Sequence, residues 1–120
     1  MAQIKDIAGQ AKANEYFRHV LATGQHTQVV IMSIPPAEEI GEEVHPDNDQ
    51  VLYLLEGAGQ VVLEGQPADF NSGDLVLVPA GTRHNFITRG DGPMKIITTY
   101  SPPHHPDGTI HKTKDEADAA

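Results

Sequence analysis

The sequence contains no cysteine and few basic residues, and both absences limit its chemistry. Without cysteine, disulfide bonds and thiolate catalysis are excluded. The 120 residues carry 8 Lys and Arg against 17 Asp and Glu, and the resulting net charge of −9 argues against nucleic acid or an anionic membrane surface as a partner. No apolar run approaches the ~20 residues of a membrane span, and the N-terminus lacks the charged-then-apolar pattern of a signal peptide. We therefore expect a cytoplasmic protein that binds neither nucleic acid nor membrane.

Sustained helical periodicity is also lacking, and short apolar runs separated by turns rich in Gly, Pro and Asn take its place. Strands are expected at residues 16–21, 27–34, 51–55, 59–63, 75–78, 84–88 and 95–100. This spacing is typical of a β-sandwich or barrel. We expect one domain over residues 1–120, with a barrel core at 16–101.

The two ends of the chain carry weaker patterns. Residues 1–15 show no clear apolar stripe and predict an irregular or weakly helical lead-in. The tail, residues 102–120, begins as an extended loop rich in Pro and His, and its last nine residues are expected either to form a short helix or to be disordered.

Polar side chains gather just before the strand that begins at Val51. If the chain is extended there, Glu43 and His45 lie on the same face, because side chains alternate with a period of two. A four-residue loop then allows Gln50 to open the next strand beside them, with Leu52 and Leu54 continuing its inward face into the core. One carboxylate, one imidazole and one amide would thus meet at one rim.

A second imidazole follows 34 residues after Gln50, in the stretch from Gly73 to Thr88. An apolar strand there ends in the Pro79-Ala-Gly81 turn, which reverses the chain and places His84 at the start of the next strand. Phe86 shares the face of His84.

Both segments resemble the two motifs of the cupin superfamily. The second matches Gly, five residues, Pro-x-Gly, two residues, His, with Thr88 in place of the usual final Asn. In the first, the expected His-x-His pair and Glu are represented by Glu43, His45 and Gln50, and six residues separate Gln50 from Gly57 as in the family pattern.

The resemblance implies a small single-domain cupin with the double-stranded β-helix, or jelly-roll, fold, all-β in class. It also implies that one metal ion is bound by Glu43, His45, Gln50 and His84, with Asp49 as the alternative to Glu43. Nitrogen and oxygen ligands of this kind suit divalent Mn, Fe, Ni, Co or Zn. Small cupins generally pair through their sheets, so a homodimer is expected.

Two classes of function follow for such a site. The first is a metal-dependent isomerase or lyase that moves a proton at a carbon next to a metal-bound carbonyl of a sugar-derived or keto-acid substrate, through an enediolate. The second is a non-catalytic module that binds or senses a small ligand or a metal. Dioxygenase chemistry with Fe(II) is a further alternative.

Three residues are candidates to contact a small-molecule substrate. Arg83, next to His84, either orients a substrate carboxylate or pairs with an acidic loop. Phe86 lies on the predicted inward face. Tyr100, with the His104-His105 pair, is expected to cover the barrel mouth or to belong to a dimer surface.

Overall fold

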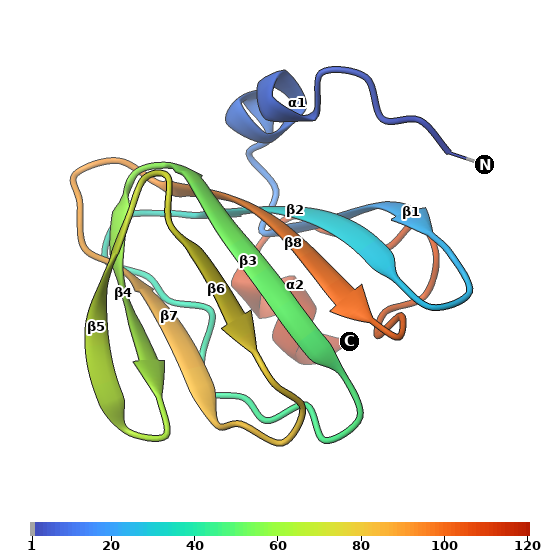
Figure 1. Cartoon of the computed structure of the whole chain (residues 1–120). Coiled ribbons are helices and arrows are strands. Elements are labelled where there is room, and N and C mark those ends of the chain that lie inside the picture. Colours follow the sequence, from blue (N-terminus) through green and yellow to red (C-terminus); the bar gives the residue numbers. More distant parts are fainter. Residues whose placement is uncertain (1) are drawn as a thin grey trace.

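The computed structural model describes residues 2–120, which form two antiparallel β-sheets facing each other (Figure 1). The strands are β1 (Arg18–Thr23), β2 (Gln28–Ile34), β3 (Asp49–Glu56), β4 (Ala58–Leu63), β5 (Gln66–Asn71), β6 (Leu75–Val78), β7 (His84–Thr88), β8 (Met94–Ser101) and β9 (Ile110–His111). The helices are α1 (Ile7–Ala13) and α2 (Lys114–Ala119). The jelly-roll prediction is confirmed.

The strand order explains how distant segments meet. One sheet has the order β6-β3-β8-β2-β1-β9 and the other the order β5-β4-β7. In the larger sheet, β8 pairs with both β2 and β3, so that Tyr100 lies opposite Gln28 on one side and Gln50 on the other. The two sheets bury their facing sides against each other.

The core is made by alternate residues of these strands. Leu52 and Leu54 of β3 are fully buried, as are Phe70 and Phe86 of the smaller sheet, whose rings lie 5.2 Å apart. Burying each such side chain contributes roughly 1.5–3 kcal/mol relative to leaving it exposed. The predicted inward face of Gln50 is confirmed by its exposed fraction of only 3%.

The N-terminal lead-in forms one short helix that packs on the outer side of the larger sheet, against β2, β3 and β8. Asp6 caps its start by accepting a hydrogen bond from the backbone N–H of Gly9. The buried Lys95 of β8 fastens the segment after the helix, because its ammonium donates hydrogen bonds to the carbonyl of Asn14 and the hydroxyl of Ser33.

Two elements differ from the sequence-based expectation. No strand was expected at β5, and in the structure only Phe70 among its six residues is buried. The tail is not an extended loop throughout, since β9 pairs with β1, and the alternatives for its end are resolved in favour of the helix α2. Ala117 of α2 packs against the core.

Within residues 2–120, no helix combines the length and the apolar character needed to cross a membrane.

Candidate metal centre and its cavity

The backbone itself brings the two motifs together. The segment before β3 runs antiparallel to β7, and Glu43 and His84 exchange both backbone hydrogen bonds, each at 2.9 Å. Two residues further on, the carbonyl of His45 accepts from the N–H of Gly81 in the turn before β7. This pairing fixes Glu43, His45 and His84 at one end of the two sheets.

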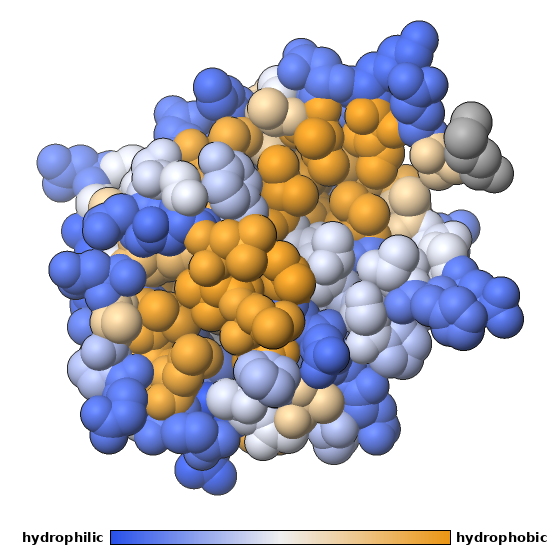
Figure 2. Space-filling model, viewed as in Figure 1, coloured by the Kyte–Doolittle hydropathy of each residue, from blue (hydrophilic) through white to orange (hydrophobic). Residues whose placement is uncertain are grey.

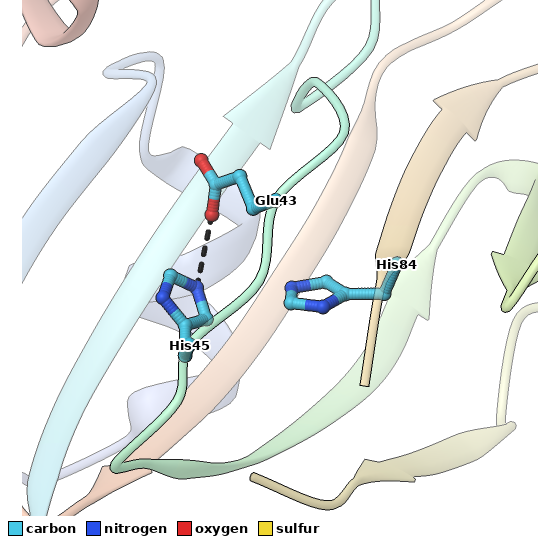
Figure 3. A group of neighbouring side chains, drawn as sticks. All are labelled: Glu43, His45 and His84. Atoms are coloured by element: carbon cyan, nitrogen blue, oxygen red, sulfur yellow. Dashed lines mark ion pairs between the residues drawn. The ribbon is translucent and has the colours of Figure 1, made fainter. Parts of the chain in front are cut away.

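Their side chains converge, as Figure 3 shows. One ligand atom from each of Glu43, His45 and His84 lies within 4.8 Å of the others. The imidazole rings of the two histidines are 5.1 Å apart between centroids, and Oε2 of Glu43 is 2.9 Å from Nε2 of His45. Both histidines are buried, whereas the side chain of Glu43 keeps 33% of its surface exposed.

The hydrogen bonds leave the donor atoms of the two histidines available. Nδ1 of His84 lies 2.9 Å from the carbonyl of Thr82, which can only accept, so Nδ1 carries the proton and Nε2 keeps its lone pair. Nε2 of His45 is buried and, despite its short distance to Glu43, makes no hydrogen bond of acceptable direction to any residue from 2 to 120. A buried imidazole nitrogen that makes no hydrogen bond is suited to bind a metal ion.

Gln50 shows the same feature. Its amide nitrogen donates to the hydroxyl of Thr98 at 3.1 Å, which fixes the orientation of the amide. Its Oε1 is buried and has no hydrogen-bond partner among the described residues. The residues present therefore fit a divalent ion, and Gln50 as its fourth ligand stays a prediction.

The charge of Glu43 is maintained in this position. Burial on its own would raise the pKa of the Glu43 carboxyl, but the hydrogen-bonding contact with His45 and the electrostatic influence of Arg18 and the two histidines outweigh it, so the pKa lies below its ordinary value. The group of Glu43, His45 and His84 thus holds one carboxylate and two imidazoles, and its carboxylate is negatively charged.

A cavity of about 300 Å³ opens beside these side chains. Its wall is lined by Glu43, His45, Arg18 and residues of the C-terminal tail, including His104 and Asp118. The ring of His104 lies 4.4 Å from that of His45 between centroids. The tail is therefore a wall of the site.

Tyr100 lies at the bottom of this arrangement. It is 2% exposed, and its ring is 5.7 Å from that of His45 and 5.4 Å from that of His104. Burial raises the pKa of the Tyr100 hydroxyl to about 12, against the opposing influence of Arg18 and the amide of Gln50. Tyr100 does not itself line the cavity, and its contact with a substrate stays a prediction.

The other predicted site residues lie elsewhere. The Arg83 side chain is 59% exposed, forms an ion pair of 3.5 Å with Glu42 and does not line the cavity, so the acidic-loop alternative describes it. Phe86 is fully buried against Phe70 in the core and does not line the cavity either. Asp49 is exposed and accepts a hydrogen bond from the N–H of Ala80, as a loop cap does.

Sequence reasoning missed Arg18, the buried cation of this cavity. Its backbone pairs with His111 of β9, and Nη1 lies 3.0 Å from Nδ1 of His111, 93 residues away. The sequence offered one indication of this role: Arg18 lies two residues before Val20 and therefore on the same, inward face of β1. A charged residue on the buried face of a strand is uncommon.

Comparisons with known proteins agree with this architecture. The crystal structure of BH2720 from Bacillus halodurans superposes with a TM-score of 0.97 at 40% identity, covering 100% of this chain and 96% of that one. YrkC of Bacillus subtilis is 41% identical over 123 residues, 98% of this chain and 66% of that protein. Acireductone dioxygenase of the same organism is 31% identical over 68 residues, 52% of this chain and 38% of that protein. The chain thus spans about two thirds of YrkC and less than half of the dioxygenase.

The family assignment rests on the region that contains the candidate metal centre. A family model described as Cupin domain matches residues 30–100, which include both motifs and all four predicted ligands. Taken with the jelly-roll sheets and the convergence of Glu43, His45 and His84, this match shows that the chain belongs to the cupin family.

Proposed function

We propose that this protein is a metal-dependent cupin enzyme that transfers a proton at a carbon next to a carbonyl group of a small oxygenated substrate, an isomerase- or lyase-type reaction. The observation that carries the proposal is the group of Glu43, His45 and His84, whose ligand atoms lie within 4.8 Å of one another, with Glu43 and His45 lining a cavity. Gln50 would complete the ligand set.

The chain's own residues prepare the site for this chemistry. The carbonyl of Thr82 orients His84, and Thr98 orients the amide of Gln50, so the ligands are positioned in advance. A divalent ion held by this set would act as a Lewis acid and polarise a substrate oxygen. A neutral amide ligand donates less electron density to the ion than a carboxylate does, so the ion would remain a stronger Lewis acid. The cavity of about 300 Å³ suits a small molecule.

Metal content is the first test. The purified chain is expected to contain close to one equivalent of a divalent metal by mass spectrometry, and the His84→Ala variant to lose most of it. The matched control is His26→Ala, because His26 is exposed in the turn between β1 and β2. Wild-type protein that takes up no divalent metal from Mn to Zn would overturn the proposal.

The reaction itself is tested by isotope exchange. We expect the metal-loaded protein to exchange the proton next to the carbonyl of a sugar acid or keto acid in D₂O, observed by NMR, with loss of exchange in His84→Ala. Metal bound without exchange across such a panel would favour a binding or sensor module instead.

A second candidate is an Fe(II) dioxygenase, favoured by the similarity to acireductone dioxygenase over 68 residues. The test is oxygen consumption by the Fe(II)-loaded protein with these same substrates. Oxygen consumption, together with no deuterium exchange in the absence of oxygen, would favour the dioxygenase over the proton-transfer enzyme.

A further inference from the structure

Arg18 places a positive charge inside the molecule and forms no ion pair with any residue from 2 to 120. The residue is 5% exposed, and it points inward from β1. The ion pairs found among residues 2–120 join His45 to Glu43, Arg83 to Glu42 and Lys114 to Asp118, and none includes Arg18. Its Nε is buried and has no hydrogen-bond partner in that range. Buried charges in proteins are normally paired, so this one requires an explanation.

The groups that surround the guanidinium do not supply the missing charge. Nη1 lies 3.0 Å from Nδ1 of His111, and the guanidinium carbon lies 5.2 Å from the centre of the Phe17 ring. The hydroxyl of Tyr100 is also near enough for Arg18 to oppose the rise of its pKa, but with a pKa of about 12 this hydroxyl is neutral and supplies no negative charge. Burial, with the nearby Arg18 charge, lowers the pKa of His105 to about 3 and also lowers that of His111, so both imidazoles are neutral near pH 7. The acidic side chains of the cavity, Glu43 and Asp118, form no ion pair with Arg18; Glu43 is in contact with His45 and Asp118 with Lys114.

The same cavity reaches both Arg18 and the candidate metal centre. Arg18, Glu43, His45 and His104 all line the cavity of about 300 Å³. A small molecule that fills it can therefore contact both the guanidinium and the two predicted metal ligands that line the cavity, Glu43 and His45. The counterion of Arg18 is then supplied by the ligand.

The free edge of the guanidinium indicates which anion. Since Nη1 is occupied by His111, the side formed by Nε and Nη2 is left, and these two parallel N–H groups match the two oxygens of one carboxylate. We propose that Arg18 binds a carboxylate group of the substrate, and that the substrate class is therefore small carboxylate anions. This deepens the proposed function and rests on it for the reaction, but not for the binding.

The test uses the full chain freed of metal with a chelator, and lactate as the probe. We expect lactate, titrated to roughly 50 mM because one charged pair gives only weak affinity, to shift the NMR signals of the Arg18 Nε–H and of the cavity-lining amides. The neutral isostere lactamide should shift neither. Arg18→Met should abolish the lactate response, and Arg18→Lys, which keeps the charge but not the two-donor edge, should weaken binding about tenfold.

Arg83→Met is the matched control, because Arg83 is exposed and outside the cavity. It should bind lactate as the wild type does. If Arg18→Met does not fold, the Arg18→Lys and Arg83→Met pair still decides the outcome.

Three results would overturn the inference: equal shifts with lactamide, lactate binding unchanged in Arg18→Lys, or tighter binding of inorganic phosphate than of lactate. A zinc titration of the same samples separates this inference from the proposed function. Lactate binding that depends on Arg18 in a protein that takes up no metal supports the carboxylate site alone. Metal uptake with lactate binding that ignores Arg18 supports the metal centre alone.

Discussion

At the scale of single residues, the amide of Gln50 gives this centre its character. A carboxylate is the usual oxygen ligand at this position of the first cupin motif, and here Glu43 supplies the one negative charge instead. Gln50 is 3% exposed, and a neutral amide costs less to bury there than a carboxylate in the absence of metal. We therefore expect Gln50 to stabilise the metal-free chain and to bind a metal less tightly than a carboxylate at this position would.

This balance predicts two opposite effects of Gln50→Glu. Divalent metal affinity should rise by roughly tenfold or more, because a second carboxylate adds Coulombic attraction. The free energy of unfolding of the metal-free protein should fall by about 1–3 kcal/mol, because the substitution buries an acidic group in place of a neutral amide. Competition with a chelating dye measures the first, and urea unfolding the second.

Gln66→Glu is the control, since Gln66 begins the exposed strand β5. It adds the same charge on the surface and should change neither quantity by much. Unchanged metal affinity in Gln50→Glu would show that position 50 is not a ligand.

At the scale of elements, the C-terminal tail is fastened over the cavity by one buried side chain. The amide of Gln28, fully buried on β2, donates to the carbonyl of His105 at 2.7 Å and accepts from the N–H groups of His104 and His105. The backbone N–H groups of Phe17 and Val20 donate to tail carbonyls further along. Because His104 lines the cavity, this attachment also forms its wall.

We therefore expect Gln28→Leu to detach the tail. The substitution removes the hydrogen bonds to His104 and His105 and should lower the free energy of unfolding by roughly 2–4 kcal/mol. Hydrogen exchange should accelerate most at Phe17 and Val20, whose amides are bonded to the tail. Gln25→Leu, at an exposed position, is the control. Acceleration spread evenly over β3 and β8 instead would indicate general destabilisation.

Two kinds of sequence pattern predicted strands correctly: alternating burial, as in β3 and β7, and a run of Val and Ile, as in the nearly fully buried β2. In β3 and β7 buried and less buried residues alternate, and β7 and β6 have the predicted ends. β5 was missed because solvent covers nearly all of it, so its sequence carries no alternation, and Pro67 argues against a strand. Pairing with β4 makes it a strand, and pairing is not visible in a local window.

The same distinction applies to the candidate site. Glu43, His45 and His84 could be predicted to meet because fixed spacings place them at strand ends on two short segments. Arg18 and the tail could not, because the contact between Arg18 and His111 joins residues 93 apart and depends on how the tail folds back. Arg83 was preferred only for its closeness to His84 in sequence, but neighbours on a strand point to opposite faces.

At the scale of the whole molecule, the outer face of the larger sheet is apolar. Figure 2 shows this patch over β3 and β6, continuing towards α1. Cross-strand register places Leu75 beside Tyr53 and Leu77 beside Val51, and the two leucines are 61% and 56% exposed. Exposed neighbouring apolar groups of this kind commonly mark an interface.

We propose that two copies of the chain pair through this face and so form the expected homodimer. Analytical ultracentrifugation of the wild type should show a dimer. The double variant Leu75→Asp, Leu77→Asp in the edge strand β6 should raise the dimer dissociation constant by at least about a hundredfold, because burying each leucine contributes roughly 1.5–3 kcal/mol. Ile110→Asp is the control, because Ile110 is 44% exposed on β9 at the opposite edge of the same sheet. A wild type that sediments as a monomer at all concentrations, or a dimer that Ile110→Asp disrupts while the β6 variant does not, would contradict this interface.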